Sequence, residues 1–406
     1  MTISRRQFVA LSAPAMLSLG ALSPRFLRRA AAQSAASSQE NILVVVQLSG
    51  GNDGLNTVVP HRDDEYRKRR PTLALPESDL LTVNDDFGLH PALTGFAQLY
   101  ENGQLGIIQG VGYANPNRSH FEAMDIWHTC LRKSDSRPDG WLGRTVDDLQ
   151  SHHHVDVPAL HLGNRKQPFA LSSREHRVPS IKSLEQFRLE LEHRESLGEF
   201  QRGVTSQRDV ASPLLDFVQT STDTAINVSQ KLQASTANYK SDVTYPDTEL
   251  GRDLKTVAQL INADLATRIF YVELDGFDTH SQQADAHTAL LRKMSEAVSI
   301  FTQDMIAHGH GRRVLTVCFS EFGRRVEENA SKGTDHGTAA PMFIAGENAR
   351  AGLIGDHPSL TDLEQGDLKF HTDFRQVYAG LLEQWLGVAS PEILHGTFKP
   401  VAVVKV

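Results

Sequence analysis

The sequence predicts an α/β fold with a mostly parallel central sheet, and two kinds of observation predict it. The first is a set of apolar runs that end in loops rich in glycine or acidic residues, as buried parallel strands do. These runs lie at 42–48, 105–112, 157–162, 269–274, 313–319 and 341–345. The second is the order of strand, helix and strand along the chain. The length of 406 residues allows one large domain or two of ordinary size.

Residues 284–309 lie between two of these runs and have the spacing of an amphipathic helix. Apolar side chains recur at Leu290, Leu291, Met294, Val298, Phe301 and Met305, and Gly309 marks the expected helix end. A strand, a helix and a strand in this order predict a right-handed βαβ unit. A last helix is expected at 374–387, which ends in glycine.

Residues 183–265 differ in composition from the rest of the chain. They are rich in Glu, Gln, Ser and Leu, and 183–202 and 248–266 show the pattern of amphipathic helices. We therefore expect 183–265 to be a helical insertion or cap within a single domain that spans 41–406.

The first 32 residues resemble a twin-arginine signal peptide, followed by a polar linker at 33–40. Consecutive arginines in SRRQFV, a short apolar stretch and Ala30-Ala31-Ala32 stand in the order of such a signal. The alternative is an amphipathic N-terminal helix. Export predicts a periplasmic or secreted protein that has the twin-arginine machinery as a partner. The apolar stretch is too short and too polar for a stable membrane span.

Charge and cysteine content exclude some functions. The net charge is −8, and the basic run RKRR at 67–70 is expected to be a solvated loop, so the sequence predicts no nucleic-acid binding. Two cysteines cannot form a cysteine-based zinc site, and Cys318 lies in an apolar run as a core residue would.

Carboxylates and histidines cluster where the predicted strands end, which is where an open parallel sheet places its functional groups. They are Asp53, Asp275, Asp278, His280, Glu321, Asp335 and His336. Imidazole and carboxylate ligands suit zinc, manganese or a similar divalent ion. These seven residues are therefore the predicted metal ligands.

Each of these residues also has a purely structural explanation. Asp53 could be a turn residue, and Asp278 or Asp335 could cap a helix or loop. Glu321 is harder to explain in this way, because a glutamate that ends a central strand is costly to bury unless it is paired. A metal ion would offset that cost.

Ser119 begins a helix and is the candidate nucleophile. With Glu122 it could instead form a capping box. A serine at a helix N-terminus beside Arg118 lies in a positive field that favours an alkoxide or a bound anion. His120 and Asp125 on the same segment could be ligands or could support them.

Arg324 follows the strand that ends at Glu321. It could hold an anionic substrate or pair with the ligand carboxylates. The structural alternative is a salt bridge with Glu327 or Glu328.

A family resemblance follows from these segments taken together. The chain contains, in order, the leader, QLSGGNDGLNTVVP, NRSHFEAMDIWHT, ELDGFDTH, SEFGR, GTDHG and DFRQVYAGLLEQWLG. Together these segments resemble the exported bacterial family called domain of unknown function 1501. That family is similar to the alkaline phosphatase and sulfatase superfamily. The resemblance implies a three-layer α/β/α sandwich, two divalent metals at the strand ends, and a serine or threonine nucleophile.

Carried over residue by residue, the resemblance implies that Asp53 binds one metal and that Ser119 is the nucleophile. It further implies that His280, with Asp275 or Asp278, binds the other metal and that His336 completes the set.

This chain departs from the superfamily in two places. Glu321-Phe322 stands where an Asp-His pair is usual, so one imidazole is missing unless His120 or Asp335 replaces it. The sulfatase nucleophile signature is also absent around Ser119.

The expected function is that of an exported, metal-dependent hydrolase of phosphate or sulfate esters, with one or two zinc or manganese ions and a small-molecule or glycan ester as substrate. The alternative is a non-catalytic relative that binds a cell-envelope glycan or a protein partner.

Overall fold

A computed structural model describes residues 40–152, 155, 157–182, 239–263 and 265–405. The described residues from Asn41 onward belong to one compact unit. The predicted leader lies outside the described residues, and so does the first of the two helices predicted within 183–265. No helix in the described part of the chain is long and apolar enough to cross a membrane.

The centre of the molecule is a nine-stranded sheet of order β13-β5-β12-β9-β1-β8-β6-β7, with β16 also paired to β5. The strands are β1 (Ile42–Ser49), β5 (Leu105–Gly112), β6 (Ala159–Leu162), β7 (Ser180–Ile181), β8 (Ile269–Asp275), β9 (Val314–Phe319), β12 (Ala340–Ala345), β13 (Gly352–Ile354) and β16 (Thr372–Asp373). Every strand predicted above is present. β1 lies parallel to both β8 and β9, which confirms the mostly parallel sheet.

The strand β12 runs against this direction, because it is antiparallel to both β9 and β5. The start of β12 therefore lies at the edge of the sheet where β1, β8 and β9 end. For this reason, residues that precede β12, such as His336, lie close to residues that follow the parallel strands.

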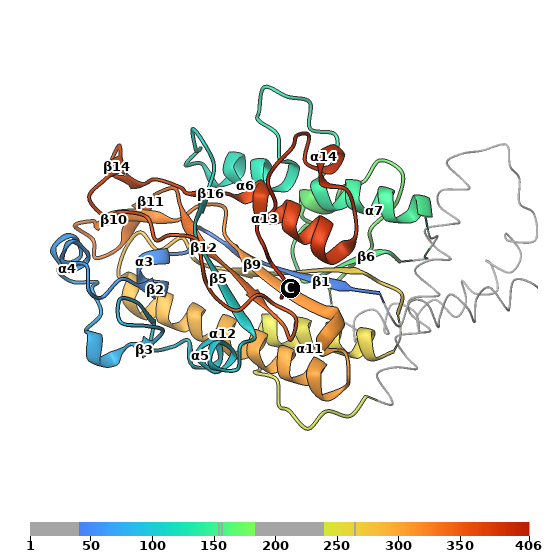
Figure 1. Ribbon diagram of the computed structural model, residues 1–406, viewed down its shortest axis with the longest axis horizontal. Coiled ribbons are helices and arrows are strands. Elements are labelled where there is room, and N and C mark those ends of the chain that lie inside the picture. Colours follow the sequence, from blue (N-terminus) through green and yellow to red (C-terminus); the bar gives the residue numbers. More distant parts are fainter. Residues whose placement is uncertain (1–39, 153–154, 156, 183–238, 264, 406) are drawn as a thin grey trace, which may run out of the picture. The chain divides into compact units, whose positions relative to one another are not determined.

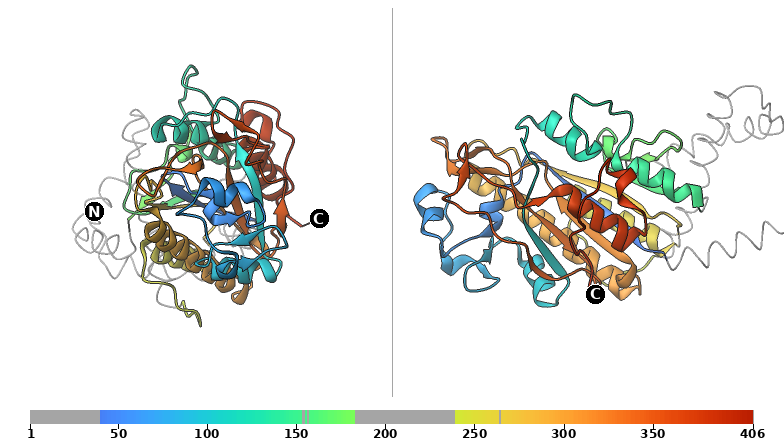
Figure 2. Two further views of the ribbon diagram at one scale, coloured as in Figure 1. Left: turned by 90° about the vertical axis from the view of Figure 1, so that its left-hand side faces the viewer. Right: turned by 45° about the horizontal axis from the view of Figure 1, so that its top comes forward.

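Helices cover both faces of the sheet, which confirms the three-layer sandwich (Figures 1 and 2). One layer holds α5 (Thr94–Glu101), α11 (Glu249–Asn262) and α12 (Gln283–Ala307). The other holds α6 (His120–Thr129), α7 (Trp141–His152), α13 (Phe374–Gly380) and the π-helix η4 (Leu381–Leu386). Side chains alternate along β1, so that Val44 and Val46 pack in the first layer and Leu43 and Val45 in the second.

Shorter elements complete the described chain. They are α3 (Gly54–Thr57), β2 (Val58–Val59), α4 (Asp64–Arg69), η1 (Glu77–Asp79), β3 (Leu81–Thr82), β4 (Gly88–Leu89), η2 (Phe169–Leu171), η3 (Gly311–Arg313), β10 (Arg324–Glu328), β11 (Thr334–His336), β14 (Leu363–Glu364), β15 (Asp367–Leu368) and α14 (Ser390–Ile393).

The predicted helix between β8 and β9 is α12, and its apolar positions are buried. Leu291, Met294, Val298 and Phe301 all lie in the core, and burying each such side chain stabilises the fold by roughly 1.5–3 kcal/mol. The chain turns at Gly309 with φ +78°, a conformation that glycine adopts at little cost.

The helix α11 is the described part of the predicted insertion. It is amphipathic as expected, and Leu250, Leu254 and Val257 pack in the same core cluster as α12. This helix therefore forms part of the sandwich. The proposed cap role of 183–265 stays a prediction.

Two helix starts differ from each other. Asp373 caps α13 in a full capping box with Gln376. Ser119 stands at the cap position of α6, but its side chain accepts no hydrogen bond from the helix backbone, and Glu122 pairs with Arg137 instead. The capping box considered for Ser119 is therefore wrong.

Candidate metal centre

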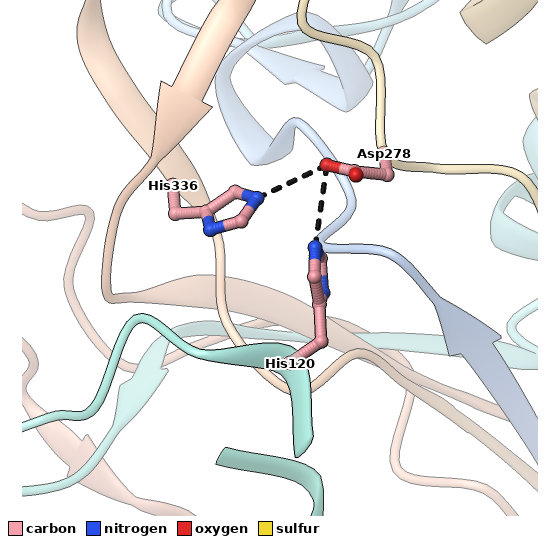
Figure 3. Close-up of side chains that lie close together, drawn as sticks. All are labelled: His120, Asp278 and His336. Atoms are coloured by element: carbon pink, nitrogen blue, oxygen red, sulfur yellow. Dashed lines mark hydrogen bonds and ion pairs between the residues drawn. The ribbon is translucent and has the colours of Figure 1, made fainter. Parts of the chain in front are cut away.

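The carboxyl ends of β1, β8 and β9 gather side chains from three distant segments of the chain. Asp278 and His280 follow β8, His336 ends β11, and His120 opens α6. Figure 3 shows His120 and His336 pointing at the carboxylate of Asp278. These four residues are called the metal centre below.

The donor atoms of the metal centre converge on one carboxylate oxygen. Asp278 Oδ1 lies 3.0 Å from His336 Nε2, 3.0 Å from His280 Nε2 and 3.3 Å from His120 Nε2. The Nε2 atoms of His280 and His336 are 2.9 Å apart. A tetrahedral zinc ion with bonds of 2.0–2.1 Å has its ligand atoms about 3.3 Å apart. The spacings around Asp278 Oδ1 are therefore close to the distance between two ligand atoms of a zinc ion, and the ligand atoms of His120, Asp278 and His336 all lie within 4.8 Å of one another.

The other ring nitrogen of each histidine faces a fixed acceptor. His120 Nδ1 lies 2.8 Å from Glu321 Oε1, and His280 Nδ1 lies 3.2 Å from Asp335 Oδ1. His336 Nδ1 lies 2.7 Å from the backbone carbonyl of Arg118. These oxygens only accept, so an imidazole that bound an ion through Nε2 would keep its proton on Nδ1.

If each Nε2 is unprotonated, lone pairs and a carboxylate face one another at about 3 Å, and positive charge is needed to offset this. Burial by itself would raise the pKa of Asp278, but hydrogen bonds from His336 and Arg324 outweigh it and hold that pKa well below its ordinary value. The hydrogen bond to Glu321 raises the pKa of His120. A divalent ion or added protons would supply the charge.

Glu321 is buried, with 2% of its surface exposed, and the protein itself satisfies its carboxylate. It accepts hydrogen bonds from the backbone N–H of Gly50 at 2.9 Å and from Ser320 Oγ at 3.1 Å, in addition to His120. Its burial is therefore explained without a direct bond to a metal. The geometry gives Glu321 the role of orienting His120, as carboxylates behind metal-bound histidines do.

Arg324 is buried, and its guanidinium is engaged with the protein. It donates to the carbonyls of Gly50, Gly51, Phe277 and Thr334 and, at 2.8 Å, to Asp278 Oδ1. Of the two roles expected for Arg324, these contacts correspond to pairing with a ligand carboxylate.

The salt bridge considered as a structural alternative for Arg324 is wrong. Glu327 pairs with Arg69 at 2.8 Å, and Glu328 accepts hydrogen bonds from Thr72. Arg324 instead ties the ends of β1 and β8 to β11.

Two of the predicted ligands lie apart from the metal centre. Asp53 is fully buried and pairs with Arg70 at 2.6 Å, while Asp275 is exposed and pairs with Arg165 at 2.6 Å. Burial raises the pKa of Asp53, but Arg70 outweighs this effect and lowers it.

The prediction that the basic run 67–70 is a solvated loop is wrong. Its first three residues belong to α4, and Arg70 is completely buried against Asp53. The side chain of Arg70 also donates to Asn56 at 2.8 Å and to the carbonyl of Val326 at 2.9 Å. A buried ion pair at this position could not be predicted from a cluster of like charges in the sequence.

The candidate nucleophile Ser119 is exposed and stands directly before His120. Its backbone N–H donates to Asn117 Oδ1 at 2.8 Å, which fixes the turn that leads into α6. The carbonyl of Arg118 orients His336, and its guanidinium pairs with the buried Asp367.

A polar cleft of about 440 Å³ opens beside Arg118. Its lining includes Tyr113, Asn115, Asn117, Thr338, Asp367 and Lys369. Neither Ser119 nor the four residues of the centre line this cleft, but Arg118 links the two, because its carbonyl lies 2.7 Å from His336 Nδ1.

Comparison with known proteins places the chain in a family. Residues 40–389 match the model of the family described as protein of unknown function DUF1501, so the chain belongs to that family. No curated protein matches the sequence.

The solved structures with a similar fold have little sequence identity to this chain. The C-terminal periplasmic domain of EptC from Escherichia coli, in complex with zinc, has a TM-score of 0.36 at 10% identity over 76% of this chain and 74% of its own. An alkaline phosphatase mutant from the Antarctic bacterium TAB5, with magnesium bound, has a TM-score of 0.37 at 10% identity over 78% of this chain and 95% of its own. The sulfatase PsFucS1 from Pseudoalteromonas has a TM-score of 0.38 at 9% identity over 94% of this chain and 75% of its own.

Proposed function

We propose that this protein is a metal-dependent hydrolase of phosphate or sulfate esters. One divalent ion, zinc or manganese, would be held by His120, Asp278, His280 and His336, and Ser119 would be the nucleophile. The observation that carries the proposal is the spacing of three Nε2 atoms around Asp278 Oδ1 while every Nδ1 is held by an acceptor. Such an outer set of hydrogen bonds is typical of histidines that bind metals.

When bound, the ion would stabilise the negative charge that develops on the transferred group. The protein's own residues support the same step. Ser119 stands at the N-terminus of α6, where the helix dipole favours an anion, and Arg118 is partly exposed beside the cleft. Ser119 Oγ would attack the phosphorus or sulfur as the alcohol leaves. Water would then release the inorganic anion from the serine.

The contacts of two arginines favour one ion at this centre over two. Arg70 and Gln283 both donate to Oδ2 of Asp53, the carboxylate expected to bind a second ion, while its Oδ1 has no hydrogen-bond partner among the described residues. Arg324 donates to Asp278 from the side that faces β1. Guanidinium groups thus provide positive charge on that side of the centre.

The same contacts of Asp53 also favour a second candidate function, because a centre with fewer ions than the superfamily uses could serve binding alone. In that case the protein would bind a cell-envelope glycan or a protein partner at the cleft. For the hydrolase, the proposed substrate is a small-molecule or glycan ester. Under either function, we propose export by the twin-arginine machinery to the periplasm or outside the cell.

The test is a screen of aryl and sugar phosphate and sulfate esters with the metal-loaded protein. We expect hydrolysis that falls by about 10⁴-fold or more in Ser119→Ala, because the nucleophile is removed. Ser78→Ala, which changes an exposed serine away from the centre, is the matched control and should retain full activity.

Activity that persists in Ser119→Ala would exclude this serine as nucleophile. A metal-loaded protein that hydrolyses none of the esters but binds a glycan or protein would support the binding function instead.

A further inference from the structure

The polar cleft is connected to the candidate metal centre by Arg118. The backbone carbonyl of this residue lies 2.7 Å from His336 Nδ1, and Arg118 also lines the cleft. The cleft volume of about 440 Å³ is within the range of about 300–1,000 Å³ that is typical of ligand sites. An ester whose phosphate or sulfate group lay at the centre could therefore extend its alcohol part along Arg118 into the cleft.

The basic side chains that line the cleft are already paired. Arg118 forms an ion pair with Asp367, and Lys369 forms one with Asp362. The other charged residue in the lining is Glu364, which is exposed and has no ion-pair partner among the described residues. An acidic ligand would thus find no uncommitted cation in the described lining, and the carboxylate of Glu364 would repel it.

The polar groups that remain uncommitted in the cleft are uncharged. Asn115 and Gln365 are exposed, and the side chain of neither forms a hydrogen bond with a described residue. Asn117 uses its Oδ1 to accept from the backbone N–H of Ser119 at 2.8 Å, and its amide nitrogen has no acceptor among the described residues. Amide side chains both donate and accept, so these three can bind groups that do the same.

Tyr113 adds a buried hydroxyl to the lining. Only 3% of this residue is exposed, and its ring is fixed between Phe374 and the guanidinium of Arg132, which lies 5.1 Å from the ring centroid. The hydroxyl oxygen accepts from the backbone N–H of Asn117 at 3.0 Å, while the hydroxyl proton has no acceptor in the described part of the chain. Burial raises the pKa of Tyr113, so the proton stays on the hydroxyl. A buried donor of this kind is costly unless it finds an acceptor, which a ligand in the cleft would provide.

We propose that the cleft binds a neutral sugar. Sugar hydroxyls both donate and accept, as the free amides of Asn115 and Gln365 do, and a sugar oxygen can accept from Tyr113. The absence of charge avoids repulsion from Glu364. The inference rests on the proposed function for the position of the ester group, and it narrows the substrate class to phosphate or sulfate esters of neutral sugars.

The first test measures binding without any reaction. Saturation-transfer NMR is recorded on the full chain with methyl glucoside, methyl galactoside and methyl N-acetylglucosaminide, and with methyl glucuronide and methyl galacturonide as acidic counterparts. We expect a neutral glycoside to bind at least about fivefold more tightly than its matched uronide, because Glu364 repels the added carboxylate.

Two further measurements assign the binding to the cleft. Asn115 and Gln365 have φ angles of +47° and +54°, which glycine adopts at little cost, so the variant Asn115→Gly, Gln365→Gly retains the backbone. Its affinity for the neutral glycoside should fall by about tenfold or more, because hydrogen bonds from two side chains are lost. Glu364→Gln should reduce the preference over the uronide to less than about twofold. Glu101→Gln, an exposed residue of α5 outside the cleft, is the matched control and should retain the full preference.

The outcomes separate this inference from the proposed hydrolase activity. Neutral glycosides that bind at the cleft, in a protein that hydrolyses no ester, would remove the hydrolase function and leave the inference standing. Ester hydrolysis by a protein that binds none of the neutral glycosides would do the reverse.

The inference is also overturned if the uronides bind as tightly as the neutral glycosides, or if the double glycine variant binds like wild type. Circular dichroism checks that each variant is folded. If the double variant does not fold, the change in preference caused by Glu364→Gln decides the question.

Discussion

At the scale of single residues, the geometry of the candidate metal centre depends on the hydrogen-bond acceptor of each histidine Nδ1. Asp335, Glu321 and a backbone carbonyl hold the Nδ1 atoms, so the Nε2 atoms are oriented in the metal-free protein. Preorganisation of this kind reduces the entropy that metal binding would otherwise cost.

Glu321→Gln tests the orienting role of this carboxylate. The amide retains the size of the side chain but loses its charge and one acceptor, so we expect metal affinity to fall by about 10–100-fold. Competition with a chelator of known affinity measures the change. Glu327→Gln, in which the carboxylate lies on the surface beside Arg69, is the matched control and should bind normally. Equal affinities in the two variants would contradict the role assigned to Glu321.

The pH dependence of stability tests the pairing of His120 in the metal-free protein. The pKa of His120 is raised in the fold by its hydrogen bond to Glu321. The stabilisation is therefore complete below the ordinary histidine pKa of about 6.5 and is lost as pH rises through the raised value. We expect the melting temperature of wild type to exceed that of His120→Asn by more at pH 6 than at pH 9. A difference that stays constant or grows with pH would contradict the pairing.

At the scale of elements, strand direction decides which residues meet. β12 is antiparallel, and the hairpin of β10 and β11 folds back before it, so His336 reaches the carboxyl ends of β1 and β8. Arg324, paired with His336 across that hairpin, fixes its position by donating to the carbonyls of Gly50 and Gly51. The centre is thus built on the rigid edge of the sheet, with only His120 supplied by a helix.

The helix α12 covers one face of the sheet, and Phe301 is one of its fully buried side chains. We expect Phe301→Ala to lower the free energy of unfolding by about 3–5 kcal/mol, because it leaves a cavity in a close-packed core. Lys293→Ala, on the exposed side of the same helix, should change it by less than about 0.5 kcal/mol. Denaturant titration measures both values. Similar losses in the two variants would contradict the assigned packing.

At the scale of the whole molecule, the sandwich could be predicted from the sequence because its signals are local. The strands β1, β5, β8 and β9 are continuous apolar runs, and the burial of α12 follows from the spacing of its own residues. The direction of β12 could not be predicted, since it depends on pairing with β9 and β5 far away in the sequence.

The candidate site was predictable in its residue types and only partly in its contacts. Asp278, His280 and His336 were expected together and are together. The pairing of Asp53 with Arg70 was missed, because a run of four basic residues normally marks a solvated segment. His120 was foreseen as a residue that could be a ligand, could support the ligands or could replace a missing imidazole. Its position directly after the candidate nucleophile, in the first turn of a helix, was the available signal.

The central claim is that His120, Asp278, His280 and His336 hold one metal ion. The most direct measurement is elemental analysis of the protein, purified without a chelator or affinity tag. It is compared with the variant that carries both Asp278→Ala and His336→Ala. We expect the variant to contain one equivalent of zinc or manganese less than wild type. A wild type without metal that takes up none, or a variant that retains all of it, would contradict the claim.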